Sequence, residues 1–178
     1  MAPRLAPRAS VGPGLLGYLV AALLVLVCFK AIGVRLATSA EASSTRVAMT
    51  ATEQGFVSAL DQVRAQHGLP TLAGDGRLAA AAREHSRHMI ASGTFSHGAF
   101  WKRIEAQGVT TGKVGETLGW TSRPSGAVPR IVAAWLASPE HCAILLDPIY
   151  RQVGVGVADG AFKGYSDALV VTADFHGA

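Results

Sequence analysis

Apolar residues at helical spacing mark the first ordered part of the chain. Three of them follow at intervals of four and three residues and therefore share one helix face: Phe56, Leu60 and Val63. The preceding residues Thr50 to Glu53 have the form of a capping box. Gly68 and Pro70 follow as helix terminators. The pattern predicts a helix that begins near Thr50 and ends before Gly68.

A second helix is predicted between Asp75, which suits an N-cap, and Gly93. Its inward face carries Leu78, Ala82, His85 and Met89. His85 lies among apolar residues, so we predict a hydrogen-bonded core imidazole rather than a ligand. We expect His67 and His88 to be ordinary surface residues.

The stretch from Trp135 to Gly156 combines more constraints than any other segment. It follows a third amphipathic pattern, formed by Val128, Ile131, Val132 and Trp135. Ser138 suits an N-cap because its hydroxyl can accept a hydrogen bond from a first-turn amide, and Pro139 suits the next position because no amide is needed there. His141 would then lie about one turn into a new helix.

Strand-like runs concentrate in the second half of the chain. We predict a short helix over about residues 99–107, a strand over residues 114–118, and strands over residues 152–157 and 168–175. Gly154 and Gly156 share one strand face, which suggests that another backbone packs closely there. Helices lead and strands come late, which favours an α+β fold over alternating βαβ units.

The N-terminal end has the pattern of an export signal. Arg4 and Arg8 precede an apolar run over residues 15–29, and Lys30 closes it. The run is short for a membrane span, although snorkelling of Lys30 would allow an anchor. We therefore predict a cleaved signal peptide or a signal-anchor over residues 1–42, a linker over residues 43–52, and one domain over residues 53–178. The domain would lie outside the cytoplasm.

Charge and cysteine content exclude two further classes. The chain has 178 residues and a formal charge of +4, and because residues 1–42 carry four basic residues and one acidic residue, the charge is +1 without them. The remainder lacks the basic excess of a nucleic-acid-binding protein. Cys142 is the only cysteine after Cys28, so the predicted domain cannot form an internal disulfide.

Three polar residues stand out because their neighbours are apolar, aromatic or glycine: His97, Glu116 and His141. If the fold brought them together, two imidazoles and one carboxylate would provide the ligands of an open zinc site. Without a metal they would form a general acid and base pair. Each also has an ordinary structural use, as a loop histidine, a strand glutamate and a histidine near a helix start.

The order of short motifs resembles the CAP superfamily of cysteine-rich secretory, antigen 5 and pathogenesis-related proteins, and within it the bacterial SCP-like extracellular branch. The motifs are Gly68-Leu69-Pro70, Phe95-Ser96-His97, Gly115-Glu116, Ser138-Pro139-Glu140-His141, Asp147-Pro148-Ile149-Tyr150 and Val153-Gly154-Val155-Gly156. The resemblance implies a three-layer α-β-α sandwich with a central antiparallel sheet. It also implies a cleft where His97, Glu116 and His141 meet and where some members bind a divalent metal.

The chain departs from the bacterial pattern beside this cleft. It has Thr117 after Gly115-Glu116 where relatives have asparagine, Cys142 and Ile144 after His141 where they have arginine and asparagine, and Ala173 in place of a glutamine. We therefore expect a binding module for a lipid-like or envelope ligand rather than an enzyme. A metal-dependent hydrolase and an envelope interaction domain with a vestigial cleft are the alternatives. The oligomeric state and the ligand stay open.

Overall fold

The computed structural model describes residues 49–178, and the predicted signal or anchor segment lies outside these residues. The first described helix, α2 (Ala51–Gln66), begins with the predicted capping box. The Thr50 hydroxyl accepts a hydrogen bond of 3.2 Å from the Glu53 amide, and the Glu53 carboxylate accepts one of 2.7 Å from the Thr50 amide. No helix among residues 49–178 combines the length and apolar composition that a membrane span needs.

Within residues 49–178 four strands form one sheet in the order β1-β3-β4-β2. They are β1 (Ala73–Gly74), β2 (Lys113–Thr121), β3 (Gln152–Phe162) and β4 (Tyr165–Gly177). β4 pairs antiparallel with both β2 and β3, whereas the short β1 runs parallel to β3. The three long strands extend beyond their predicted bounds. A tight turn at Lys163 and Gly164 lets polar residues continue the β3–β4 hairpin, and β2 is longer because all its residues pair with β4.

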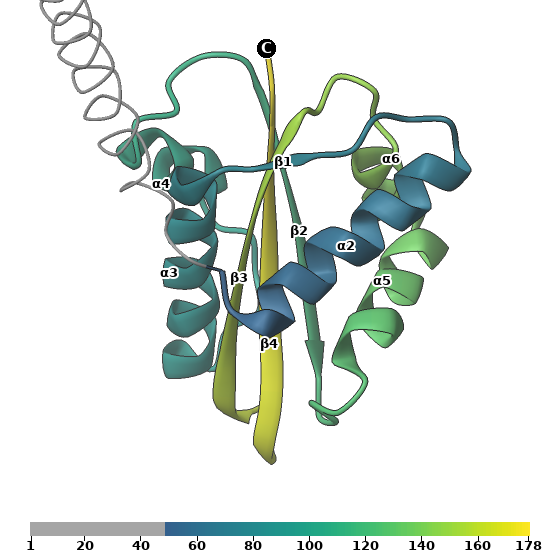
Figure 1. The fold of residues 1–178 in the computed structure, drawn as a ribbon. Coiled ribbons are helices and arrows are strands. Elements are labelled where there is room, and N and C mark those ends of the chain that lie inside the picture. Colours follow the sequence, from purple (N-terminus) through teal and green to yellow (C-terminus); the bar gives the residue numbers. More distant parts are fainter. Residues whose placement is uncertain (1–48) are drawn as a thin grey trace, which may run out of the picture. The chain divides into compact units, whose positions relative to one another are not determined.

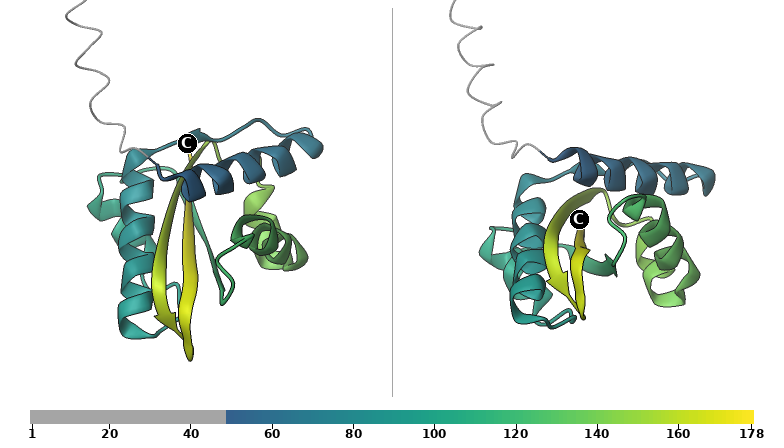
Figure 2. Two further views of the ribbon diagram at one scale, coloured as in Figure 1. Left: turned by 60° about the horizontal axis from the view of Figure 1, so that its bottom comes forward. Right: turned by 90° about the horizontal axis from the view of Figure 1, so that it is seen from below.

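Helices cover both faces of this sheet (Figures 1 and 2). One face carries α3 (Gly76–Ser92) and α4 (Phe100–Ala106). The opposite face carries α2, α5 (Ala127–Ala137) and α6 (Pro139–Leu145). The arrangement confirms the predicted three-layer α-β-α sandwich and its largely antiparallel sheet.

The face under α2, α5 and α6 holds the main apolar core, which includes Phe56, Leu60, Trp135, Val155, Val171 and Phe175. Trp135 satisfies its indole N–H by donating to the Leu118 carbonyl at 2.7 Å. Two charged side chains of α2 are also buried, Glu53 and Arg64, and Arg64 is fully buried. Its guanidinium donates to backbone carbonyls of Pro70, Leu145, Asp147 and Tyr150. Arg64 therefore fixes the chain where α6 ends and the path to β3 begins.

The opposite face brings a helix backbone onto a strand. A Cβ atom added at Gly154 would lie 2.0 Å from the Ala79 amide nitrogen, and one at Gly156 would lie 2.1 Å from the Arg83 amide nitrogen. This contact confirms the close backbone approach predicted from the two glycines. Nearby, the Ser86 hydroxyl donates to the Gly156 carbonyl at 2.8 Å.

The start of α6 differs in one detail from the prediction. Ser138 is the N-cap with an extended backbone, and Pro139 occupies the first turn, as expected. The Ser138 hydroxyl, however, makes no capping hydrogen bond. Ser138 also ends α5, where its own amide donates to the Trp135 carbonyl at 3.2 Å. The backbone of one residue therefore serves two helix ends, and the hydroxyl contributes to neither.

Candidate functional site

A cleft of about 360 Å³ lies along the edge strand β2, between α4 and α6. Its polar lining consists of His97, Glu116, Glu140 and His141. Its apolar lining includes Phe100, Val114, Ile144 and Tyr150. The structure thus brings the three candidate residues from the sequence to one cleft, although 19 and 25 positions separate them in the chain. Their roles stay predictions.

Glu116 is the buried centre of the cleft, with 2% of the residue exposed. The Nδ1–H of His97 donates to its Oε1 at 2.7 Å, and Arg103 donates from Nη2 to its Oε2 at 2.5 Å. Arg103 also donates from Nη1 to the His97 carbonyl at 2.9 Å. Arg103 therefore holds His97 twice, through the backbone and through the carboxylate that orients the imidazole.

Arg103 was not predicted from the sequence. It lies on α4, 13 positions before Glu116, and its surroundings in the sequence resemble those of any basic residue on a short surface helix. The one usable signal was the set of apolar neighbours of Glu116, because a carboxylate buried among them needs a partner of opposite charge. Several basic residues met that condition, so the sequence did not select Arg103.

A second buried acid, Asp174, was also not predicted. It lies on β4 directly opposite Glu116 in the strand pairing and is fully buried. Neither of its carboxylate oxygens has a hydrogen-bond partner among residues 49–178. Burial, and then the charge of Glu116, raise the pKa of Asp174 well above its ordinary value. Burial also raises the pKa of Glu116, against the opposing effects of Arg103 and His97.

The two carboxyl groups therefore cannot both ionise easily. Glu116 accepts hydrogen bonds from His97 and Arg103, which stabilise its charge, whereas Asp174 accepts none among the described residues and the charge of Arg103 offsets its burial only in part. Asp174 is consequently the member of the pair that keeps a proton. The ionised Glu116 of the cleft therefore lies beside a neutral Asp174 on the neighbouring strand β4.

His141 approaches from α6, on the other side of the cleft. Burial, and then the nearby His97, lower the pKa of His141, which favours its neutral form. The neighbouring Cys142 is half-buried and has a free thiol.

The cleft residues fit a metal only in part. Among residues 49–178 no three His, Cys, Asp or Glu side chains are grouped so that they could hold a metal ion. Both oxygens of Glu116 already accept hydrogen bonds. His97, with Nδ1 directed to Glu116, keeps the lone pair of Nε2 free, as a metal-bound imidazole with a carboxylate behind it does. His97 and His141 would thus be the protein ligands of a divalent ion, which would supply a Lewis acid.

A three-layer sandwich with two histidines and a glutamate at the edge of its sheet defines the class of this protein. The family model described as "CAP: Cysteine-rich secretory protein family" matches residues 57–175. The chain therefore belongs to this family, as the order of its motifs predicted.

Bacterial proteins are among the similar ones. YlbC of Bacillus subtilis, named as an uncharacterized membrane protein, is 31% identical over 113 residues, which are 61% of this chain and 32% of YlbC. A Bacillus anthracis structure, described as an extracellular protein containing a SCP domain, is 25% identical with a TM-score of 0.59, over 71% of this chain and 40% of that one. This chain therefore spans less than half the length of both.

An outer surface protein from Borrelia burgdorferi supports the fold alone. It is 22% identical with a TM-score of 0.56, and the match covers 71% of this chain and 96% of that protein. The Borrelia protein is thus covered almost completely by the same fold.

Proposed function

We propose that the chain is an extracytoplasmic, non-catalytic binding module whose cleft holds a lipid-like or envelope ligand. The observation that carries this proposal is the state of Glu116. Its oxygens accept hydrogen bonds from His97 and Arg103, and 2% of the residue is exposed, so the carboxylate is engaged in holding the wall of the cleft. These hydrogen bonds support a structural role for Glu116 in a binding cleft rather than a role in proton transfer.

The composition of the cleft supports an amphipathic ligand. Phe100, Val114 and Ile144 offer apolar surface, and His97 and His141 offer polar groups. A volume of about 360 Å³ lies within the range of small-molecule sites. One part of a lipid-like molecule fits such a cleft, with its polar end at the imidazoles.

Location is the second part of the proposal. A similar protein is described as extracellular and another as a membrane protein. These descriptions agree with the predicted signal peptide or signal-anchor over residues 1–42, followed by the linker over residues 43–52 and the domain over residues 53–178. In this arrangement the N-terminal segment directs the domain out of the cytoplasm, either for release or for retention at the membrane.

Native mass spectrometry of the full chain extracted from cells tests the binding role. We expect a co-purifying ligand on the wild-type chain and none on Ile144→Trp, because the larger side chain fills the cleft. Ile149→Trp is the matched control, since Ile149 is not among the cleft-lining residues and is 37% exposed. A wild-type chain without any ligand, together with flat lipid titrations, would remove the basis of the proposal.

A metal-dependent role is the second candidate, and the orientation of His97 favours it. His97 and His141 would hold zinc, with Glu116 behind His97. This role predicts stoichiometric zinc in the purified chain and its loss in His141→Ala, whereas the exposed His67→Ala keeps it. Equal metal content in both variants would exclude it. If both the ligand and the metal are absent, the remaining alternative is an interaction domain with a vestigial cleft.

A further inference from the structure

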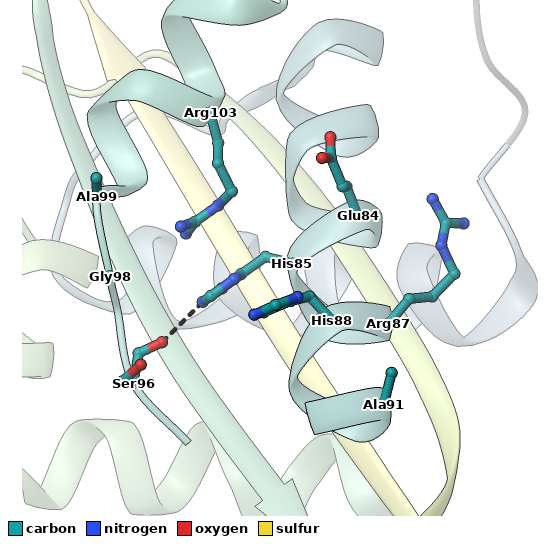
Figure 3. Close-up of a pocket in the computed structure, with 9 residues that line it drawn as sticks. All are labelled: Glu84, His85, Arg87, His88, Ala91, Ser96, Gly98, Ala99 and Arg103. Atoms are coloured by element: carbon teal, nitrogen blue, oxygen red, sulfur yellow. Dashed lines mark hydrogen bonds between the residues drawn. The ribbon is translucent and has the colours of Figure 1, made fainter. Parts of the chain in front are cut away.

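A second cavity, of about 560 Å³, lies between α3 and the loop before α4. It shares no lining residue with the cleft. Alternate residues of one loop separate the two sites, since Ser96 and Gly98 face the cavity and His97 faces the cleft. Figure 3 shows His85, His88 and Arg103 gathered beside α3, opposite Ser96.

Basic side chains dominate this cavity. Its ionisable lining consists of Glu84, His85, Arg87, His88 and Arg103. The two arginines are charged at any physiological pH; Glu84 is the one carboxylate in the lining, and Glu116, which lies outside the lining, is paired with Arg103. Arg103 is fixed in place by its bonds to Glu116 and to the His97 carbonyl. Its Nε–H is buried and has no hydrogen-bond partner among the described residues.

The histidines contribute different groups. His85 Nε2 lies 2.9 Å from the Ser96 carbonyl, so this nitrogen carries the proton, and in the neutral ring Nδ1 carries a lone pair. No hydrogen bond among residues 49–178 uses that Nδ1. His88 is exposed, and its ring lies 6.5 Å from that of His85 at an interplanar angle of 14°. The cavity therefore presents fixed cationic donors and one acceptor.

These features argue against a metal cation. A metal ion lies in the plane of each imidazole that binds it, and two nearly parallel rings do not direct their lone pairs at one point. The arginines also repel a cation. A carboxylate ligand would satisfy the donors, but it has no proton to offer to Nδ1 of His85. A phosphate monoester or hydrogen phosphate accepts several hydrogen bonds and also carries an O–H.

We propose that this cavity binds a phosphate group, either free phosphate or the monoester end of a lipid, between Arg103, His85 and His88. Arg87 also lines the cavity, but its exposed side chain points away from His85 and His88 (Figure 3). Because Arg103 also holds Glu116 and His97, the phosphate site and the cleft share one structural residue while keeping separate linings.

Histidine NMR signals of the full chain in neutral detergent provide the test. Inorganic phosphate, added at constant ionic strength, is expected to shift the His85 and His88 signals to saturation and leave those of His67 in place. Acetate is expected to act much more weakly. If only micelles that contain phosphatidic acid produce the shift, the phosphate comes from a lipid headgroup. Failure of both phosphate sources, or an equal effect of acetate, would overturn the proposal.

Substitutions locate the site. His88→Gln removes an exposed cavity side chain and is expected to weaken phosphate binding about fivefold, the scale of one hydrogen bond. Arg87→Gln is expected to have a smaller effect, because the Arg87 side chain points away from His85 and His88. Arg123→Gln, an exposed arginine outside the cavity, is the control and keeps wild-type affinity. Wild-type affinity in both cavity variants would contradict this location.

Discussion

The two faces of the sheet follow different rules. Under α2, α5 and α6 most buried side chains are apolar; the buried charge of Arg64 is satisfied by backbone carbonyls, and that of Glu53 by Arg83. Under α3 and α4 two smaller apolar clusters accompany buried acids and hydroxyls, including Glu116, Thr172 and Asp174. Burying an unpaired polar group costs stability. The comparison suggests that the first face stabilises the fold, whereas the second retains groups that serve binding.

The largest predicted effect is on the packing of α3 against the sheet. Gly154→Ala places a Cβ atom 2.0 Å from the Ala79 amide nitrogen, so the helix must move away. We expect a loss of more than about 3 kcal/mol in the free energy of unfolding, measured by urea denaturation. Gly55→Ala makes the same chemical change within α2, where the nearest contact is 3.4 Å, and is expected to be neutral or stabilising. Equal effects of the two substitutions would refute the close packing of α3.

The second prediction concerns Arg64, a buried charge of the apolar face. Arg64→Met keeps the apolar stem but leaves carbonyls of Leu145 and Tyr150 without their donor. We expect a loss of about 2 to 3 kcal/mol in the free energy of unfolding. Arg130→Met is the matched control, since Arg130 is exposed and its loss is expected to change stability by less than about 1 kcal/mol. A stable Arg64→Met variant would show that the carbonyls find other donors.

The sequence predicted most of the fold because its signals were local. The capping box at Thr50, the apolar spacing in α2 and the paired glycines of β3 each specify backbone geometry within a few residues. The short β1 was missed, since two residues carry no periodicity. Arg64 was missed as well, because its partners lie up to 86 positions away.

The candidate site could be predicted only where motifs marked it. His97, Glu116 and His141 stood out by their apolar neighbours and by the family order, and the structure places them at one cleft. Arg103 and Asp174 had no such mark. Asp174 reaches Glu116 through the pairing of β2 and β4, a contact between positions 58 apart that no local pattern encodes.

The third prediction tests the neutral acid on the polar face. Because the folded state raises the pKa of Asp174, the native protein binds more protons than the unfolded chain above about pH 4, and its stability falls as the pH rises through this window. Asp174→Asn cannot ionise. We expect its stability relative to the wild type to increase with pH, by at most about 1.4 kcal/mol per pH unit.

Urea denaturation at several pH values between about pH 5 and about pH 7 measures this effect. The exposed Asp167→Asn is the control and is expected to follow the wild-type pH dependence. If Asp174→Asn destabilises the protein most strongly at high pH, Asp174 is ionised in the folded state and has a cationic partner. The buried acids under α3 and α4 would then all have partners of opposite charge, and this face would differ less from the face under α2, α5 and α6.

The smallest predicted effect belongs to His85, at the boundary between the polar face and the phosphate cavity. Burial, and then the charge of Arg103, lower the pKa of His85 from 6.5 to about 4. The native state therefore binds fewer protons than the unfolded chain, and its stability is lost as the pH falls from about 6.5 toward about 4.

The Gln side chain in His85→Gln can still donate to the Ser96 carbonyl but does not titrate. We expect this variant to lose about 1 kcal/mol less than the wild type on acidification to about pH 5, since nearby solvent reduces the full effect. His67→Gln, an exposed histidine on α2's C-cap, is expected to change nothing. If the wild type and His85→Gln lose the same stability on acidification, protonation of His85 does not destabilise the folded state. The face under α3 and α4 would then accept a positive charge on His85 beside that of Arg103.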